Sequence, residues 1–228
     1  MKVRPAADRD LDAYIRIQEE EWGESMAASR LQLESRLNAF PDGVLVAEHD
    51  GEVIAGATFM KLPDYNLADA RSWSDLTEDG WCNNHDPEGS ALFGVDLSVS
   101  RRAPRSASAR IFAAGLALTV SEGTEGVYWG SRLPRYHKYA DKMTPDEYLH
   151  TKNRRGRYLD PEIQLYSRIP GVQVLGVVPD YFKDWESENW GAILSWPNPV
   201  RRLPFLRPFS DQIISMVYTL ERWRNKRT

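Results

Sequence analysis

The stretch that decides the fold runs from Ala91 to Ala117 and reads ALFGVDLSVSRRAPRSASARIFAAGLA. Its first part is largely apolar and predicts a strand over Ala91–Val99. Its last part is rich in alanine and leucine and predicts a helix over Ala107–Ser121. A short polar loop joins the two, so a strand leads directly into a helix.

The residues before this stretch predict a strand, two helices and a hairpin. Asp50-Gly51 lies between two β-rich runs, and Asp-Gly favours the tight turn of a hairpin. Pro63–Ser90 is rich in turn-forming residues and is predicted to be mainly a long loop. The expected elements are a strand over Val3–Pro5, a helix that presents Leu11, Tyr14, Ile15 and Gln18 and is capped by Asp8 or Asp10, a helix over Ser29–Phe40, and strands over Val44–Glu48 and Val53–Leu62.

The residues after it complete a mixed α/β pattern. A capping residue followed by proline and acidic residues marks helix starts at Thr144 and Asp160. The other expected elements are strands over Gly126–Ser131, Gly171–Val178 and Trp190–Trp196, and a helix over about Ser210–Arg224 with an apolar stripe of Ile213, Ile214, Val217, Leu220 and Trp223. This order predicts a central mixed sheet flanked by helices.

The chain is expected to form one domain over residues 1–196, with a helical insertion at about 132–158. Residues 197–228 would then be a proline-rich linker and a helix. We expect this helix to pack on its own domain; pairing with a neighbouring chain, in a homodimer rather than a monomer, is the alternative.

Composition excludes several classes of protein. Of the 228 residues, 42% are hydrophobic and 27% are charged, which is typical of a globular chain. Apolar stretches reach only about ten residues, roughly half of a membrane span, and the N-terminus has no apolar signal core. Cys82 stands alone, no zinc-ligand spacing occurs, and the net charge is −4. We therefore expect a cytoplasmic protein that binds no membrane, no nucleic acid and no metal.

One segment departs from this acidic balance. Residues 132–157 concentrate positive charge, with Arg132, Arg135, Lys138, Lys142, Lys152, Arg154, Arg155 and Arg157. Two interpretations are open: a solvated helical face, or a rim that attracts an anionic substrate.

The stretch Leu92–Gly115 resembles the fourth strand, phosphate loop and third helix of GNAT-type acetyltransferases. DPEIQLYSRIPGVQVLGVVPDY, from Asp160, is similar to the late helix and sixth strand of that family, and VRPAADRDLDAYIRI and GVLVAEHDGEVIAGATF are similar to its first helix and its hairpin. GSRLPRYHKYADKMTPDEYL resembles a subgroup with a helical insertion after the fifth strand. The resemblance covers about residues 2–196 and implies the GNAT fold.

The resemblance also implies acetyl-CoA or another acyl-CoA as co-substrate. Backbone N–H groups at a helix N-terminus attract phosphate. Pro104–Ala109 aligns with the glycine-rich phosphate loop but contains no glycine. The residues expected to hold the donor are Arg105, Ser106, Ala107, Ser108, Ala109 and Arg110 at its phosphates, and Leu97, Ser98 and Val99 at its thioester.

The chemistry implied is direct acyl transfer to an amine of a small molecule. Tyr166 matches the tyrosine that protonates the leaving thiolate, and Asp96 matches an acidic residue that serves as general base. Each has an alternative role, Tyr166 in packing and Asp96 as a partly exposed carboxylate. Glu21, Trp22, Tyr136 and His137 are the residues expected to line the acceptor pocket.

Two other functions remain open at this stage. The first is an acyltransferase that uses an acyl-carrier protein or a non-amine acceptor, for which the basic segment would provide a docking surface. The second is a non-catalytic ligand-binding module, for which the altered phosphate loop would be the signature.

Overall fold

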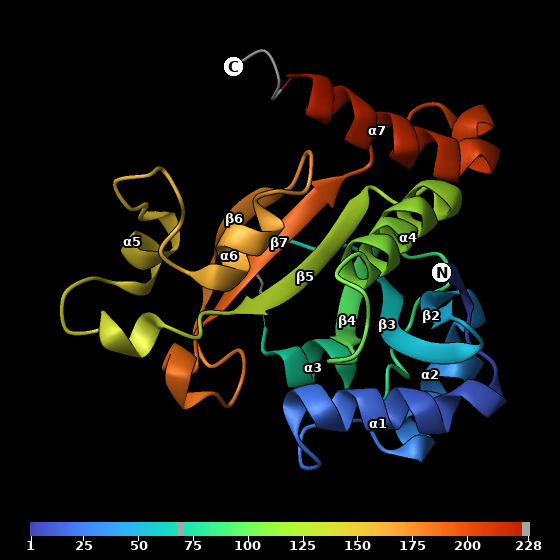
Figure 1. Cartoon of the computed structure of the whole chain (residues 1–228), viewed down its shortest axis with the longest axis horizontal. Coiled ribbons are helices and arrows are strands. Elements are labelled where there is room, and N and C mark those ends of the chain that lie inside the picture. The colour runs from blue at the N-terminus through green and yellow to red at the C-terminus, as the bar shows by residue number, and fades with distance from the viewer. Residues whose placement is uncertain (68–70, 225–228) are drawn as a thin grey trace.

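A computed structural model describes residues 1–67 and 71–224 of the chain, with side chains described up to residue 219 (Figure 1). The strands are β1 (Lys2–Pro5), β2 (Val44–His49), β3 (Glu52–Leu62), β4 (Ala91–Val99), β5 (Gly126–Arg132), β6 (Gln173–Val178) and β7 (Gly191–Pro197). The helices are α1 (Leu11–Trp22), α2 (Arg30–Ala39), α3 (Trp73–Thr77), α4 (Ala107–Glu122), α5 (Pro145–His150), α6 (Pro161–Tyr166) and α7 (Ser210–Arg224). The predicted fold class, an α/β fold with a central mixed sheet, is confirmed.

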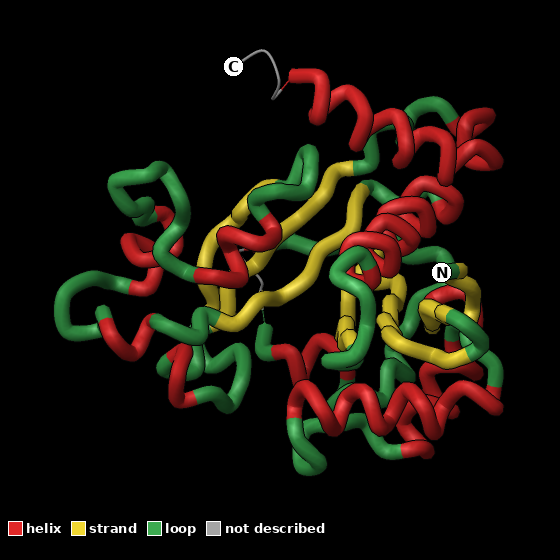
Figure 2. Tube along the Cα trace, in the orientation of Figure 1, coloured by secondary structure: helices red, strands yellow, loops and turns green. Residues whose placement is uncertain are grey.

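The seven strands form one sheet in the order β1-β2-β3-β4-β5-β7-β6. Figure 2 shows the strands of this sheet in yellow, with the helices in red around them. Neighbouring strands pair antiparallel except β4 and β5, which are parallel. The strand–helix unit of β4 and α4 supplies the crossover that a parallel pair requires.

Apolar layers cover both faces of the sheet. On β2, Leu45 and Ala47 belong to the cluster that contains α4 residues, whereas Val44 and Val46 belong to the cluster that contains α1 and α2 residues. This division follows from the alternation of side chains along a strand. The main helix α4 therefore lies on one face of the sheet, and α1 and α2 lie on the other.

The described part of Pro63–Ser90 is mainly loop, as predicted, and contains the short helix α3, which Ser72 caps. Two local predictions are wrong. Asp10 does not cap α1 with its side chain; its carboxylate binds Arg4 and the backbone N–H of Ala7 instead. Trp190 lies one residue before β7 rather than within it.

The closing helix α7 packs against α4 of its own chain (Figure 1). Ile213 and Ile214 are buried in the main apolar cluster, and Val217 is half-buried. The side chains of Leu220 and Trp223, predicted to extend this stripe, lie outside the described residues.

Candidate active site

A cavity lies where β4 and β5 separate. The two strands pair across three residue pairs, from Leu92–Val127 to Gly94–Trp129. Beyond Gly94, β4 continues along β3 while β5 continues along β7, so the facing edges of β4 and β5 diverge. The cavity between them has a volume of about 520 Å³, within the range of small-molecule sites.

Carboxylates outnumber free cations in the cavity wall. Arg36 forms an ion pair with Asp96, and Arg132 pairs with Asp184 and Glu186. This charge distribution favours a cationic ligand. The charged lining residues are Glu21, Arg36, Asp79, Asp96, Arg132, Glu162, Lys183 and Asp184, and the aromatic ones are Trp22, Phe59, Trp73, Phe112, Trp129, Tyr166 and Phe182.

Asp96 is held by two buried groups. Arg36 Nη1 and the Tyr14 hydroxyl each donate a hydrogen bond to one of its carboxylate oxygens. Arg36 is only 3% exposed, and its Nε also donates to the carbonyl of Gly80 at 2.6 Å. Asp96 thereby connects β4 to α1 and α2. Each of its two carboxylate oxygens accepts a hydrogen bond from a buried side chain.

Two backbone features bring Asp96 to these partners. The pairing of β3 with β4 is irregular at Val95, an extra residue that shifts the register before Asp96. On β3, Gly56 leaves room for the ring of Tyr14, because a Cβ at that position would lie 2.2 Å from the ring atom Cε2.

Glu162, on α6, is half-buried and lines the cavity. It accepts a hydrogen bond of 2.9 Å from Ser131 Oγ on β5. Burial raises the pKa of Glu162 to about 7; the nearby Asp160 carboxylate adds to this, and Ser131 and Arg132 oppose it. Glu162 can therefore accept or release a proton near neutral pH.

Tyr166 lies one helical turn after Glu162. Its ring packs against Trp129 and Phe112, with ring centroids 5.5 and 6.0 Å apart. Burial, together with the Glu162 and Glu21 carboxylates, raises the pKa of the Tyr166 phenol. Tyr166 therefore remains protonated at neutral pH and can donate a hydrogen bond into the cavity.

Asp160 fixes the start of α6. One of its carboxylate oxygens accepts from the backbone N–H groups of Glu162 and Ile163, at 2.9 and 3.1 Å. The other accepts from the hydroxyl of Tyr148 on α5 at 3.1 Å. The helical insertion thus positions the helix that carries Glu162 and Tyr166.

The N-terminus of α4 lacks a side-chain cap. Ser106 is the N-cap residue but makes no capping hydrogen bond. The Ala107 N–H donates to the Pro104 carbonyl at 2.8 Å, so the N–H groups of Ser108 and Ala109 and the helix dipole favour an anion. Ala107 is buried, and the Arg110 guanidinium donates to the carbonyl of Met1 at 3.2 Å. Arg105, Ser106 and Ala109 are exposed, and Ser108 is half-buried.

No protein-family model matches the sequence. The chain is 28% identical over 200 residues to "Probable hydrolase YhcX" of Bacillus subtilis, over 87% of this chain but only 39% of that protein. It is 29% identical over 203 residues to "Uncharacterized N-acetyltransferase YkwB" of the same organism, over 87% of this chain and 89% of that protein.

Two solved structures share the architecture. The loading GNATL domain of CurA from Lyngbya majuscula superposes with a TM-score of 0.75 at 20% identity, over 86% of this chain and 97% of that one. The GphF GNAT-like decarboxylase, solved with isobutyryl-CoA, gives a TM-score of 0.70 at 24% identity, over 87% of this chain and 100% of that one. The protein has the GNAT fold. The resemblance predicted from segment order is confirmed.

The GNAT fold brings five predicted site residues together at the cavity. Glu21, Trp22, Asp96, Leu97 and Tyr166 all line it. Trp22 Nε1 donates to Ser98 Oγ at 2.8 Å, and Val99 N–H donates to a Glu21 carboxylate oxygen at 2.8 Å. The expected donor strand and acceptor wall therefore touch each other.

Tyr136 and His137 lie elsewhere in the GNAT fold and do not line this cavity. The hydroxyl of the buried Tyr136 donates to the carbonyl of Met143 at 3.1 Å. His137 Nδ1 is 2.9 Å from the carbonyl oxygen of Glu186, and its ring packs on Trp185. Both residues connect the start of the insertion to its surroundings.

Sequence reasoning missed Glu162 and Arg36. Glu162 was interpreted only as part of a helix start, yet its place four residues before Tyr166 puts both on one helix face. Arg36 follows Leu33 by three residues on α2, so a charged residue on the apolar face was the available signal.

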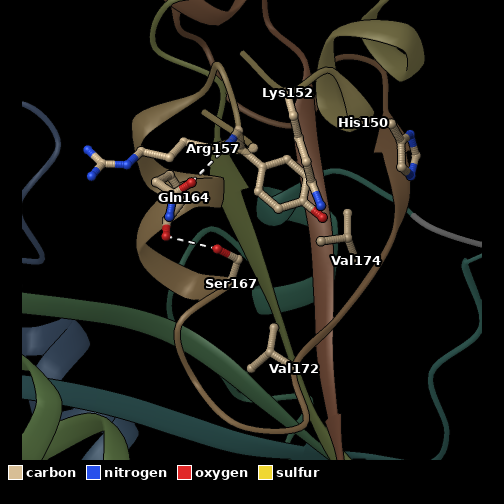
Figure 3. A pocket seen from close by; sticks show the side chains of 9 residues that line it. His150, Lys152, Arg157, Gln164, Ser167, Val172 and Val174 are labelled. Atoms are coloured by element: carbon tan, nitrogen blue, oxygen red, sulfur yellow. Dashed lines mark hydrogen bonds between the residues drawn. The ribbon is translucent and has the colours of Figure 1, made fainter. Parts of the chain in front are cut away.

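A second cavity, of about 430 Å³, lies between the insertion, α6 and β6 (Figure 3). Lys152 Nζ lies over the ring of Tyr158, 4.4 Å from its centroid. Gln164 of α6 and Ser167, the residue after α6, form one wall. Lys152 and Arg157 of the basic segment therefore line this second cavity. Arg132, at the start of the segment, forms ion pairs with Asp184 and Glu186 instead.

Within residues 1–67 and 71–224, no helix is long and apolar enough to cross a membrane. In the same described part of the chain, no group of three or more His, Cys, Asp or Glu side chains could hold a metal ion.

Proposed function

We propose that the protein moves a short acyl group, acetyl or another, from an acyl-CoA thioester to the amine of a small-molecule acceptor by direct transfer. The observation that carries this proposal is that Glu162 and Tyr166, one helical turn apart on α6, both line a carboxylate-rich cavity where β4 and β5 separate. The description of YkwB as an N-acetyltransferase and the isobutyryl-CoA bound to GphF support the reaction class and the donor.

The donor site would lie along β4. Ser100 N–H donates to the carbonyl of Ile54 on β3. Because N–H groups alternate along a strand, those of Leu97 and Val99 point away from β3, towards the gap. Such N–H groups can donate to the thioester carbonyl and stabilise the negative charge that develops on its oxygen. The uncapped start of α4 would take the phosphates.

Glu162 and Tyr166 would divide the proton transfers. As the neutral amine attacks the carbonyl carbon, a C–N bond forms and Glu162 accepts the proton that the nitrogen loses. As the C–S bond breaks, Tyr166 gives its proton to the leaving sulfur. We assign the base role to Glu162 rather than Asp96, because Arg36 and Tyr14 occupy both oxygens of Asp96.

Thiol release measures this reaction directly. Acetyl-, propionyl- and isobutyryl-CoA would each be mixed with ethylamine, tyramine, spermidine and lysine amide, and free CoA followed with a thiol reagent. Glu162→Gln and Tyr166→Phe should each lower kcat by about 100-fold or more. Tyr158→Phe, beside the second cavity, is the matched control. Full activity of Tyr166→Phe would remove Tyr166 from the mechanism, and amine-independent thiol release would contradict acyl transfer to an amine.

A second candidate is transfer to the thiol of an acyl-carrier protein. The description of the CurA structure as a loading domain and the basic charge of residues 132–157 favour it. Transfer of label from [14C]acetyl-CoA to a purified carrier protein, with no label on any of the four amines, would support this candidate over the first.

A further inference from the structure

Three consecutive glutamates, Glu19, Glu20 and Glu21, lie in the last turn of α1. The side chains of Glu20 and Glu21 contact β4 and the loop that follows it. A Glu21 carboxylate oxygen accepts the Val99 N–H at 2.8 Å. A Glu20 carboxylate oxygen lies 3.3 Å from Ser100 Oγ and 3.4 Å from the Arg101 backbone nitrogen. The Glu19 side chain makes no hydrogen bond or ion pair within the described residues.

The Val99 N–H is one of the two groups that face the gap between β4 and β5. β5 does not pair with β4 beyond Gly94, so this N–H has no strand partner on that side. The Glu21 carboxylate takes the place that a neighbouring strand would otherwise fill.

A donor lying along β4 needs the same N–H group. One N–H cannot make two full hydrogen bonds at once, and a carboxylate repels a carbonyl oxygen brought against it. Glu21 and a donor carbonyl therefore exclude each other at Val99.

The surroundings of Glu21 do not favour its charge strongly. Burial raises the pKa of the Glu21 carboxyl and the Asp96 carboxylate adds to this, whereas the Val99 hydrogen bond and the Arg101 guanidinium lower it. The end of α1 is held separately, because Trp22 Nε1 donates to Ser98 Oγ. Rotation of the Glu21 side chain alone can therefore release Val99 while α1 stays in place.

We propose that Glu21 closes the donor site in the absence of acyl-CoA and, once the donor displaces it from Val99, accepts a hydrogen bond from the neutral amine of the acceptor. The inference rests on the proposed acyl transfer. Glu21 lines the same cavity as Glu162, so a released carboxylate remains beside the place where the amine must bind. The donor binds first, and the acceptor second.

Glu21→Ala separates the two roles. Glu19→Ala is the matched control, because Glu19 is also a glutamate of α1 but its side chain makes none of these contacts. Calorimetry would measure the Kd of acetyl-CoA, and thiol release would give KM for whichever of the four amines reacts fastest. Since a hydrogen bond to a charged group is lost, Glu21→Ala should bind acetyl-CoA about tenfold more tightly. Its KM for the amine should rise by about tenfold, because the amine N–H loses a charged hydrogen-bond acceptor. Glu19→Ala should change neither quantity.

Opposite changes in the two quantities are not expected of a residue with a merely structural role. Equal or weaker binding of acetyl-CoA by Glu21→Ala would overturn the closing role, and an unchanged KM for the amine would overturn the acceptor role. Glu21→Met, which keeps the length of the side chain but has no acceptor oxygen, covers the case in which the alanine variant does not fold, and the same two changes are expected of it. Failure of the proposed function has a different signature: neither the native protein nor any variant would bind acetyl-CoA or release thiol.

Discussion

Removal of either partner of the Arg36–Asp96 ion pair should destabilise the protein strongly. Arg36 is 3% exposed, and the Arg36→Met change leaves the Asp96 carboxylate in the cavity wall without its cation. It also removes the donor to the Gly80 carbonyl. Breaking a buried pair costs about 3–5 kcal/mol. We expect about 3 kcal/mol, because Asp96 retains the hydrogen bond from Tyr14 and is partly exposed.

Thermal unfolding followed by circular dichroism measures this loss. For a chain of this size, about 3 kcal/mol corresponds to a fall in Tm of about 6–12 °C. Asp96→Asn should lower Tm similarly, since it leaves Arg36 charged and buried. The double variant should lose less than the sum of the two single losses, because the second change removes a group that has already lost its partner. If Asp96→Asn melts within about 1 °C of the native protein but loses kcat by about 100-fold, the structural role is wrong and Asp96 is the base.

Three further outcomes follow from the structure. The folded-state pKa of Glu162, about 7, exceeds its ordinary value of 4.5. The contribution of Glu162 to stability is therefore complete below about pH 4.5 and is lost as the pH rises through about 7. In Glu162→Gln, the free energy of unfolding measured in urea should depend less on pH between pH 5 and 8. A dependence as steep as that of the native protein would reject this assignment. Ile214→Ala should cost about 3 kcal/mol in urea unfolding, because Ile214 of α7 is buried in the main apolar cluster. Met216→Ala, at an exposed position on the same helix, should cost less than about 0.5 kcal/mol. Equal effects would show that α7 does not contribute to the core. Gly56→Ala should lower stability by about 1–3 kcal/mol by forcing its Cβ against Tyr14, and a variant as stable as the native protein would contradict that close approach.

Local sequence patterns were sufficient for the order of elements. The closing helix was predicted over about Ser210–Arg224 and occupies those residues, because its apolar stripe has the period of a helix. The strand over Ala91–Val99 was equally well defined. α3 was missed because a helix of five residues gives too short a periodic pattern to distinguish it from a loop.

The site was harder to predict, since its chemistry depends on contacts between distant segments. Asp96 can be placed on a face of its strand, but no local pattern indicates that Arg36, sixty positions earlier, binds it. The pKa of Glu162 likewise depends on burial and on Ser131, which lies on β5. The periodicity of a segment predicts on which face of a helix or strand a residue lies. The partner that neutralises its charge comes from another segment, so it is known only once the chain is folded.

The short parallel contact between β4 and β5 has a mechanical consequence. Three residue pairs join a half-sheet of β1–β4 to a half-sheet of β5–β7. Because so few residue pairs join them, we expect the two halves to tilt relative to each other more easily than strands within one half. A molecule bound between the diverging edges of β4 and β5 would contact both halves and restrict this tilt. Backbone amide hydrogen exchange should then slow in both halves when the molecule binds.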